Sequence, residues 1–178
     1  DIGMGLINRK QFEELKKAKE TLKNSPVYMD TNSYANIEYI ETTIKKYKQL
    51  FDINIAIVDY AQLMSERGDD QTAELGRISS RLKKLSKNLD IGIILLSQLN
   101  RLNESRTDKR PQLSDLRQSG NIEEDADMVV ALYRDDYYNK DTKYPGVLEY
   151  LIRKNRNGPT GLIPLKFDLE TNRITSSE

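Results

Sequence analysis

Asp59 directly follows a run of apolar residues, 53–58, that predicts a β-strand. Five of these six residues are apolar and none is charged, which is typical of a strand buried on both faces of a parallel sheet. Open α/β sheets bind ligands at the carboxyl ends of their strands, and a carboxylate there can hold Mg²⁺ against nucleotide phosphates. For this residue taken alone, an Asp that only caps the following loop is the alternative.

Ser97 and Gln98 follow a second apolar run, residues 91–96, for which we also predict a strand buried on both faces. Because parallel strands end at the same edge of a sheet, we expect Asp59 and Gln98 to lie at one edge. A carboxamide donates and accepts hydrogen bonds, so Gln98 can contact a terminal phosphate and respond to its loss. A loop glutamine bonded to the backbone is the simpler alternative.

Lys154 and Arg156 form a third candidate site. The apolar runs 147–152 and 162–167 are joined by a glycine-containing turn, which predicts a β-hairpin. Residues two apart point to one face of a strand, so the two basic side chains are expected to project together. Such a pair can reach a phosphate across a subunit boundary and neutralise charge in a transition state. Basic residues that protect an edge strand from aggregation are the alternative.

Residues 100–120 are rich in charge and poor in apolar side chains, and we predict a long exposed loop, a kind of segment that is usually functional. Its charged residues are Arg101, Arg106, Lys109, Arg110 and Arg117 against Glu104, Asp108 and Asp115. With no interleaved aromatic residue for base stacking, nucleic acid would be held by its phosphates, through arginines and backbone N–H groups near Gly120. A solvated loop without a ligand is the alternative.

Helices are predicted where apolar residues recur three or four apart. The first is capped by Asn8 and ends near residue 23, a short strand follows at 27–30, and a second helix is capped by Ser33 and ends near residue 50. The third helix buries Leu75, Ile78, Leu82, Leu85 and Leu89 and presents a solvated basic face of Arg77, Arg81, Lys83, Lys84 and Lys87.

The last part of the chain changes pattern. Residues 121–126 predict a short helix, 128–133 a strand and 134–145 a polar loop ahead of the hairpin. Strands that alternate with helices and then give way to a hairpin predict an α/β fold, in which a parallel sheet flanked by helices is extended by C-terminal antiparallel strands.

Composition narrows the function classes. Lys plus Arg and Asp plus Glu number 28 each, so the overall charge gives no argument for nucleic acid. The chain has no Cys and no His, which excludes disulfides, thiol catalysis and the usual zinc sites. No apolar run is long enough for a membrane span and no secretory signal opens the chain, so we expect a cytoplasmic protein with no membrane partner.

Four stretches together resemble the DnaB-type replicative DNA helicases, over about residues 26–167. They are VDYAQLM, LLSQLNR, DKRPQLSDLRQSGNIEEDADMVVALYRDDYY and KNRNGPTG, in that order. The resemblance implies a RecA-like P-loop NTPase core, and a hexameric ring of identical subunits that moves 5′ to 3′ on single-stranded DNA. It also implies ATP and Mg²⁺ as cofactors, hydrolysis at subunit interfaces, and a primase and a helicase loader as partners.

The resemblance also implies roles for single residues. Asp59 matches the Walker B aspartate, which holds Mg²⁺ through water, and Gln98 matches the residue that links the γ-phosphate to the DNA loops. Lys154 and Arg156 match the trans-acting lysine and arginine finger that complete the neighbouring subunit's site. The matched DNA-backbone contacts are Arg117, Gln118 and Gly120.

The chain departs from the family pattern in its first part. It contains neither the phosphate loop GxxxxGK[ST] nor the preceding carboxylate that activates water, and it begins with Asp1. We therefore expect a longer natural protein and no ATP hydrolysis by this chain alone. We expect one partial motor domain, with an initial loop and helix at 1–25, a parallel α/β core at 26–134 and an arginine-finger hairpin at 146–168.

Two other functions stay open at this point. A recombinase or clock-type ATPase of the RecA superfamily would share the strand that carries Asp59 and the ring assembly. A non-catalytic module that binds a helicase ring through its basic hairpin would need no phosphate loop.

Overall fold

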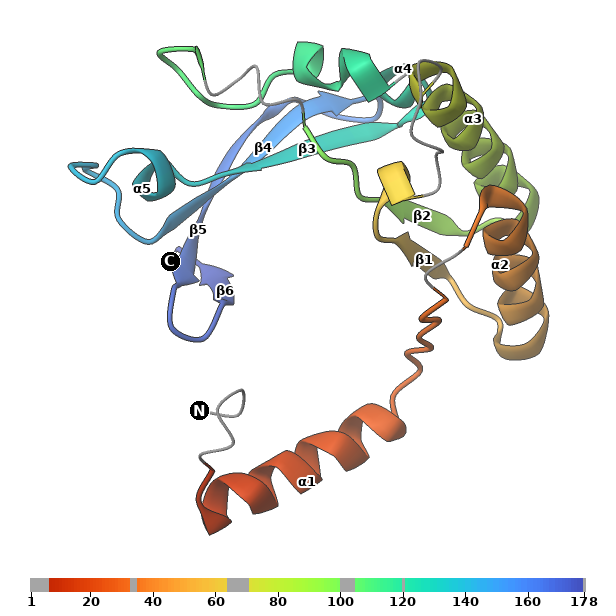
Figure 1. Cartoon of the computed structure of the whole chain (residues 1–178), viewed down its shortest axis with the longest axis horizontal. Coiled ribbons are helices and arrows are strands. Elements are labelled where there is room, and N and C mark those ends of the chain that lie inside the picture. The colour runs from red at the N-terminus through yellow and green to blue at the C-terminus, as the bar shows by residue number, and fades with distance from the viewer. Residues whose placement is uncertain (1–6, 33–34, 64–70, 100–104, 120, 178) are drawn as a thin grey trace. The chain divides into compact units, whose positions relative to one another are not determined.

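The structure, a computed structural model, describes residues 7–32, 35–63, 71–99, 105–119 and 121–177. The chain divides into two compact units, Asp1–Ser33 and Tyr34–Glu178. Figure 1 colours the first unit in red tones and the second from orange to blue. Among the helices described, none has the length and apolar character that crossing a bilayer requires.

The first unit contains one helix, α1 (Arg9–Lys23). Asn8 caps it as predicted, and a reciprocal hydrogen bond from the Asn8 backbone to Gln11 completes a capping box. The predicted strand at residues 27–30 is wrong, because these residues have no regular structure and no sheet partner in the described part of the chain. A strand depends on a neighbour for its backbone hydrogen bonds, and the local apolar pattern cannot supply one.

The second unit begins with helix α2 (Ile37–Phe51). The predicted cap at Ser33 is wrong: the Asn36 side chain accepts the hydrogen bond from the backbone N–H of Tyr39, and Ser33 lies outside the described residues. The helix ends at Asp52, whose left-handed conformation turns the chain into strand β1.

Strands β1 (Ile55–Val58) and β2 (Gly92–Leu95) form a parallel pair, with Ile55 opposite Gly92 and Val58 opposite Leu95. Helix α3 (Gln71–Leu89) connects them. As predicted, Leu75, Ile78, Leu82 and Leu85 of α3 are buried, and Leu89 is partly buried. This apolar stripe packs with residues of α2, β1 and β2.

The prediction that both apolar runs are buried on both faces is wrong. Helices α2 and α3 lie on one side of the strand pair (Figure 1), where Ala56 and Ile93 pack into the core. Alternate side chains point the other way, and Ile57 and Ile94 remain 67% and 51% exposed. No described element covers that second face. Although both runs are apolar on both faces, only the face that packs against α2 and α3 is covered.

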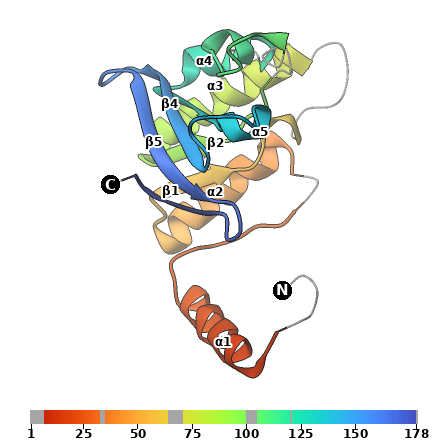
Figure 2. The ribbon, with the colours of Figure 1, turned by 90° about the vertical axis from the view of Figure 1, so that its left-hand side faces the viewer.

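The antiparallel strands form a sheet of their own, in the order β3, β4, β5, β6. Its strands are β3 (Met128–Tyr133), β4 (Val147–Asn155), β5 (Gly161–Asp168) and β6 (Arg173–Ser176). The predicted hairpin is confirmed as β4 and β5, which run side by side (Figure 2), and the predicted strand at 128–133 is confirmed as β3. Strand β6 was not predicted.

The prediction of a long exposed loop at residues 100–120 is wrong for residues 113–119, whereas the described residues 106–112 have no regular structure and are partly exposed. Residues Leu113–Ser119 form the 3₁₀ helix η4, and Asp115 and Leu116 are buried. The predicted short helix that follows is confirmed as α4 (Ile122–Asp125). The predicted polar loop at 134–145 contains a further one-turn helix, α5 (Asp135–Tyr138).

Candidate functional site

The parallel register brings the two strand-end residues to one edge of the β1–β2 pair, as predicted. Asp59 follows Val58, Gln98 lies three residues beyond Leu95, and Val58 and Leu95 are register partners. Both residues are exposed, and neither side chain has a hydrogen bond within the described part of the chain. Their polar groups are therefore open to a ligand at this edge.

Gln62, which the sequence analysis did not single out, ties the two strand ends together. Its Nε2 donates to Ser97 Oγ at 3.0 Å and to the Gln98 carbonyl at 3.2 Å, and its Oε1 accepts from the Gln98 backbone N–H at 3.1 Å. The neighbouring backbone N–H of the fully buried Ala61 donates to the Leu96 carbonyl at 2.9 Å. Gln62 thus holds the backbone of Gln98, and the Gln98 side chain stays without a hydrogen bond within the described residues.

Asp59 offers an exposed carboxylate to a metal ion. Within the described residues, no group of three or more Asp, Glu, His or Cys side chains could hold a metal ion. A single exposed carboxylate fits Mg²⁺, which keeps several waters and is completed by phosphate oxygens.

Lys154 and Arg156 both bind the carboxyl end of α4. Lys154 Nζ donates to the carbonyls of Glu123 and Glu124, and Arg156 Nη2 donates to the Glu124 carbonyl at 2.6 Å. Arg156 Nη1 also pairs with Asp127 Oδ1 at 3.3 Å. The two side chains therefore lie on one side of the hairpin, as their spacing predicted.

The turn beyond Arg156 is closed by the Asn155 side chain. Its Oδ1 accepts from the backbone N–H of Asn157 at 3.2 Å, and its Nδ2 donates to the Pro159 carbonyl at 3.3 Å. A Cβ at Gly158 would stand 2.8 Å from Asn155 Nδ2, so a larger residue there would displace this carboxamide. The turn is in this way held to the end of β4.

Two arginines fix the segment that leads to the proposed DNA-contact positions. Arg106 pairs with the buried Asp115 at 2.6 and 3.1 Å, and Arg110 pairs with the buried Glu149 of β4 through two bonds of 2.7 Å. Strand β4 also binds the segment through Arg153, whose Nε donates to the Pro111 carbonyl at 2.7 Å. Arg106 and Arg110, counted in the sequence as possible phosphate ligands, thus serve the fold.

The structure does not test the three DNA-contact residues directly. Arg117 and Gln118 belong to the backbone of η4, but their side chains lie outside the described residues, and so does Gly120. Arg101 and Glu104, two other charged residues of the predicted loop at 100–120, also lie outside the described residues.

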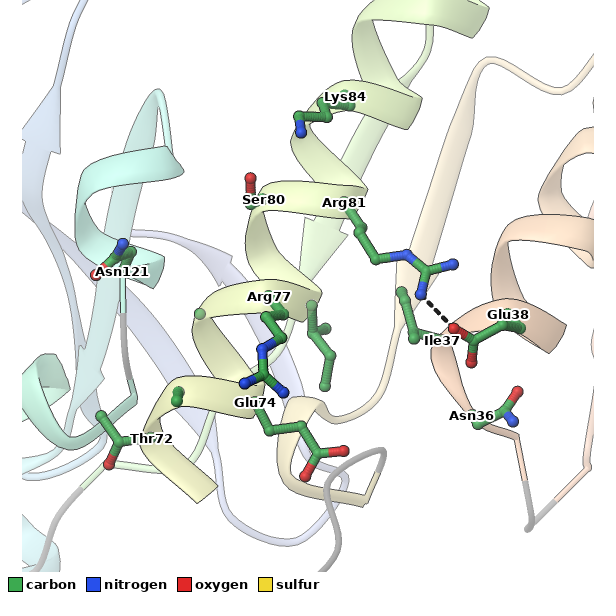
Figure 3. A pocket seen from close by; sticks show the side chains of 13 residues that line it. Asn36, Ile37, Glu38, Thr72, Glu74, Arg77, Ser80, Arg81, Lys84 and Asn121 are labelled. Carbon is green, nitrogen blue, oxygen red and sulfur yellow. Dashed lines mark hydrogen bonds and ion pairs between the residues drawn. The ribbon is translucent and has the colours of Figure 1, made fainter. Parts of the chain in front are cut away.

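A cavity of about 1090 Å³ lies between the first turn of α2 and the amino-terminal part of α3 (Figure 3). Arg77, Ser80 and Lys84 project from α3, and Asn121 borders it from the segment before α4. Arg81, at its rim, binds Glu38 and Glu41, and its hydrogen bond to Glu41 lowers the pKa of that carboxyl. The predicted solvated basic face of α3 is therefore wrong for Arg81 and for Lys83, which pairs with Asp127.

Comparison with known proteins places this geometry in a family context. The family model described as DnaB-like helicase C terminal domain matches residues 1–176. The replicative DNA helicase DnaB of Geobacillus stearothermophilus is 38% identical over 181 aligned positions, which cover 100% of this chain and 40% of that protein. The chain thus spans about 40% of the length of this curated relative.

Two solved structures share the fold. One, described as an ATPase domain, superposes with a TM-score of 0.90 at 35% identity, over 99% of this chain and 63% of that one. A DnaB-like replicative helicase, from a study of its interactions with primase, superposes with a TM-score of 0.87 at 35% identity, over 97% of this chain and 43% of that one.

Proposed function

The chain belongs to the DnaB-like helicase C-terminal domain family and has its RecA-like fold, and we propose that it is part of an ATP-driven replicative DNA helicase. In this proposal six identical subunits form a ring that moves 5′ to 3′ on single-stranded DNA. ATP is hydrolysed with Mg²⁺ between neighbouring subunits. The names of the relatives favour this function over a recombinase, a clock-type ATPase or a non-catalytic module.

The observation that carries the proposal is the shared edge of Asp59 and Gln98 at the ends of two parallel strands. At this edge Asp59 would bind Mg²⁺ through water, and the ion would neutralise phosphate charge during transfer. Gln98 has a backbone fixed by Gln62 and an unengaged carboxamide, so it can donate to the γ-phosphate and respond when that phosphate leaves.

Lys154 and Arg156 would act on the nucleotide of the neighbouring subunit. The Arg156 side chain is 48% exposed, and its guanidinium has five N–H donors, of which two bond to acceptors among the described residues. The remaining donors can bind oxygens of a phosphate brought by a second subunit. A guanidinium at that position stabilises the charge that develops on the transferred phosphoryl group.

The proposed DNA contacts are Arg117, Gln118 and Gly120. They would bind backbone phosphates, so binding should depend strongly on salt and weakly on sequence. Primase is a proposed partner, in line with the relative whose interactions with primase were studied. A helicase loader as a second partner and a cytoplasmic location complete the proposal.

Complementation between two inactive variants of the full-length protein tests the proposal. Arg156→Ala alone and Asp59→Asn alone should each abolish ATP turnover, while Arg156→Ala should leave ATP binding nearly unchanged because the finger acts in the transition state. In co-expressed mixed rings, roughly a quarter of the interfaces would combine an intact Asp59 with an intact Arg156, and turnover should return.

The control is Arg173→Ala, which removes an exposed arginine of β6 and should keep full turnover. Mixed rings that stay inactive would contradict the trans role of Arg156. If Arg156→Ala alone kept normal turnover, the finger assignment would be wrong altogether.

A further inference from the structure

The basic pair rests on a small acceptor site, which we name the α4 seat. It consists of the backbone carbonyls of Glu123 and Glu124 and the Asp127 carboxylate. The last carbonyls of a helix have no partner within the helix and carry partial negative charge. Lys154 and Arg156 supply the missing donors, so the seat and the basic pair satisfy each other.

The seat is fixed to the core of the second unit. Ile122 of α4 is buried with Leu75, Ile78 and Leu82 of α3, and the Ser79 hydroxyl donates to the Asp125 carboxylate. Its position is therefore set by the helix that packs on β1 and β2.

Asp127 is the only part of the seat that a side-chain substitution can remove. It is shared by two cations, Lys83 of α3 and Arg156, and hydrogen bonding from Lys83 is the main cause that holds its pKa below the ordinary value. The Asp127 carbonyl also accepts the Arg156 backbone N–H at 2.9 Å. Asp127 therefore contacts both the backbone and the guanidinium of Arg156.

We propose that Asp127 is a positioning residue for Arg156, holding its guanidinium in the orientation that meets the phosphate of the adjoining subunit. This inference rests on the proposed function, because it presupposes that Arg156 acts in trans. An arginine side chain has many rotamers when free, and a finger already oriented loses less freedom on reaching the transition state. The ion pair occupies one donor of the guanidinium and leaves others available.

Asp127→Asn in the assembled full-length helicase, assayed with ATP, Mg²⁺ and single-stranded DNA, tests the inference. The Asp127 side chain is 56% exposed, so an isosteric amide is compatible with folding. We expect kcat to fall about tenfold while KM for ATP stays within about twofold, since only an interaction of the transition state is weakened. Melting temperatures of all variants are measured alongside.

Lys83→Met is the matched control, because it removes the other ion pair of Asp127 and keeps the contact with Arg156. A purely structural role of Asp127 would make the two variants alike, whereas the positioning role predicts that Lys83→Met stays within about threefold of the parent kcat. Equal losses of kcat in the two variants, or an unchanged kcat in Asp127→Asn, would overturn the inference.

Arg156→Ala, measured in the same series, separates the two proposals. If it has no turnover while Asp127→Asn behaves like the parent, the positioning role of Asp127 is refuted, and the proposed trans role of Arg156 is kept. If Arg156→Ala turns over ATP normally, the proposed function of the finger fails, and the positioning role fails with it.

Discussion

Glu149→Gln is expected to loosen the segment of residues 105–116, which leads to the proposed DNA-contact positions. Glu149 is buried in β4 and holds Arg110 through two bonds of 2.7 Å. The guanidinium of Arg110 also lies 5.0 Å from the centre of the Tyr133 ring, so the pair is packed against the antiparallel sheet. The substitution keeps the shape of the side chain and removes its charge.

The size of the effect follows from these contacts. A hydrogen bond to a charged group contributes about 1.5–3 kcal/mol, and leaving a buried charge without its partner costs more. Arg110 keeps one third of its side chain exposed, so water offsets part of the loss. We expect the local free energy of opening to fall by about 2 kcal/mol, which corresponds to roughly 30-fold faster hydrogen exchange.

Hydrogen exchange of the full-length protein, followed by mass spectrometry, measures this opening. The informative amides are those of Gln112, which donates to Asp115 Oδ2 at 2.8 Å, and Asp115, which donates to the Gln112 carbonyl at 3.0 Å. Peptides from β5 should exchange at the parental rate, because that strand makes its hydrogen bonds with β4 and β6.

Asp108→Asn is the control for charge alone. Asp108 is the second acidic partner of Arg110, but its side chain is 63% exposed and 3.3 Å away, so its loss should change exchange by less than about threefold. Exchange of the Gln112 and Asp115 amides that is unchanged in Glu149→Gln, or equally fast in Asp108→Asn, would refute the reasoning.

Two further predictions concern other parts of the second unit. Gln62→Ala should lower kcat by several-fold in the full-length protein with little loss of Mg²⁺ affinity, because it releases the Gln98 backbone and leaves Asp59 in place. Steady-state kinetics at varied Mg²⁺ measure both quantities, and an unchanged kcat would contradict this prediction. Arg81→Met should destabilise the protein at neutral pH but not in acid. Arg81 lowers the pKa of Glu41 from 4.5, so its stabilisation is present above about pH 4.5 and is lost as the pH falls through the lower folded value. Urea midpoints of parent and variant should therefore converge toward acid pH, and a constant difference would exclude the carboxylate as the cause.

Local signals in the sequence were sufficient for helices α1 to α4 and for strands β1 to β5. Asn8 with Gln11 predicts the start of α1, and the leucine spacing predicts α3, because capping and amphipathic periodicity act within a few residues. Asn36 could have been recognised in the same way as the cap of α2, since it stands directly before the apolar stripe. The choice of Ser33 ignored that the cap adjoins the first helical turn.

Burial of the strands could not be predicted from the same signals. The runs at 53–58 and 91–96 carry apolar residues on both faces, but the sequence of a strand does not say which of its faces has a partner. In the described residues α2 and α3 cover one face, and Ile57 and Ile94 on the other stay largely exposed. Coverage is a property of the whole fold, whereas periodicity is a property of one strand.

Long-range polar contacts were likewise invisible in the sequence. Arg110 and Glu149 are 39 residues apart, and Gln62 and the Gln98 carbonyl are 36 apart. Only the topology brings such pairs together, so Arg110 was counted as a free cation and Gln62 was overlooked. A polar side chain three residues after Asp59 was the one available hint for Gln62, since short turns after buried strands return to the same sheet edge.

Strand β4 connects the proposed nucleotide and DNA functions through its own side chains. Glu149 and Arg153 hold the segment before residues 117–120, and Lys154, with Arg156 just beyond the strand, holds α4 directly after them. Side chains at or next to β4 therefore bind the segments that directly precede and follow the proposed DNA-contact positions in the sequence. A displacement of these positions would therefore strain charged hydrogen bonds to β4, the strand that leads to the proposed finger residue Arg156.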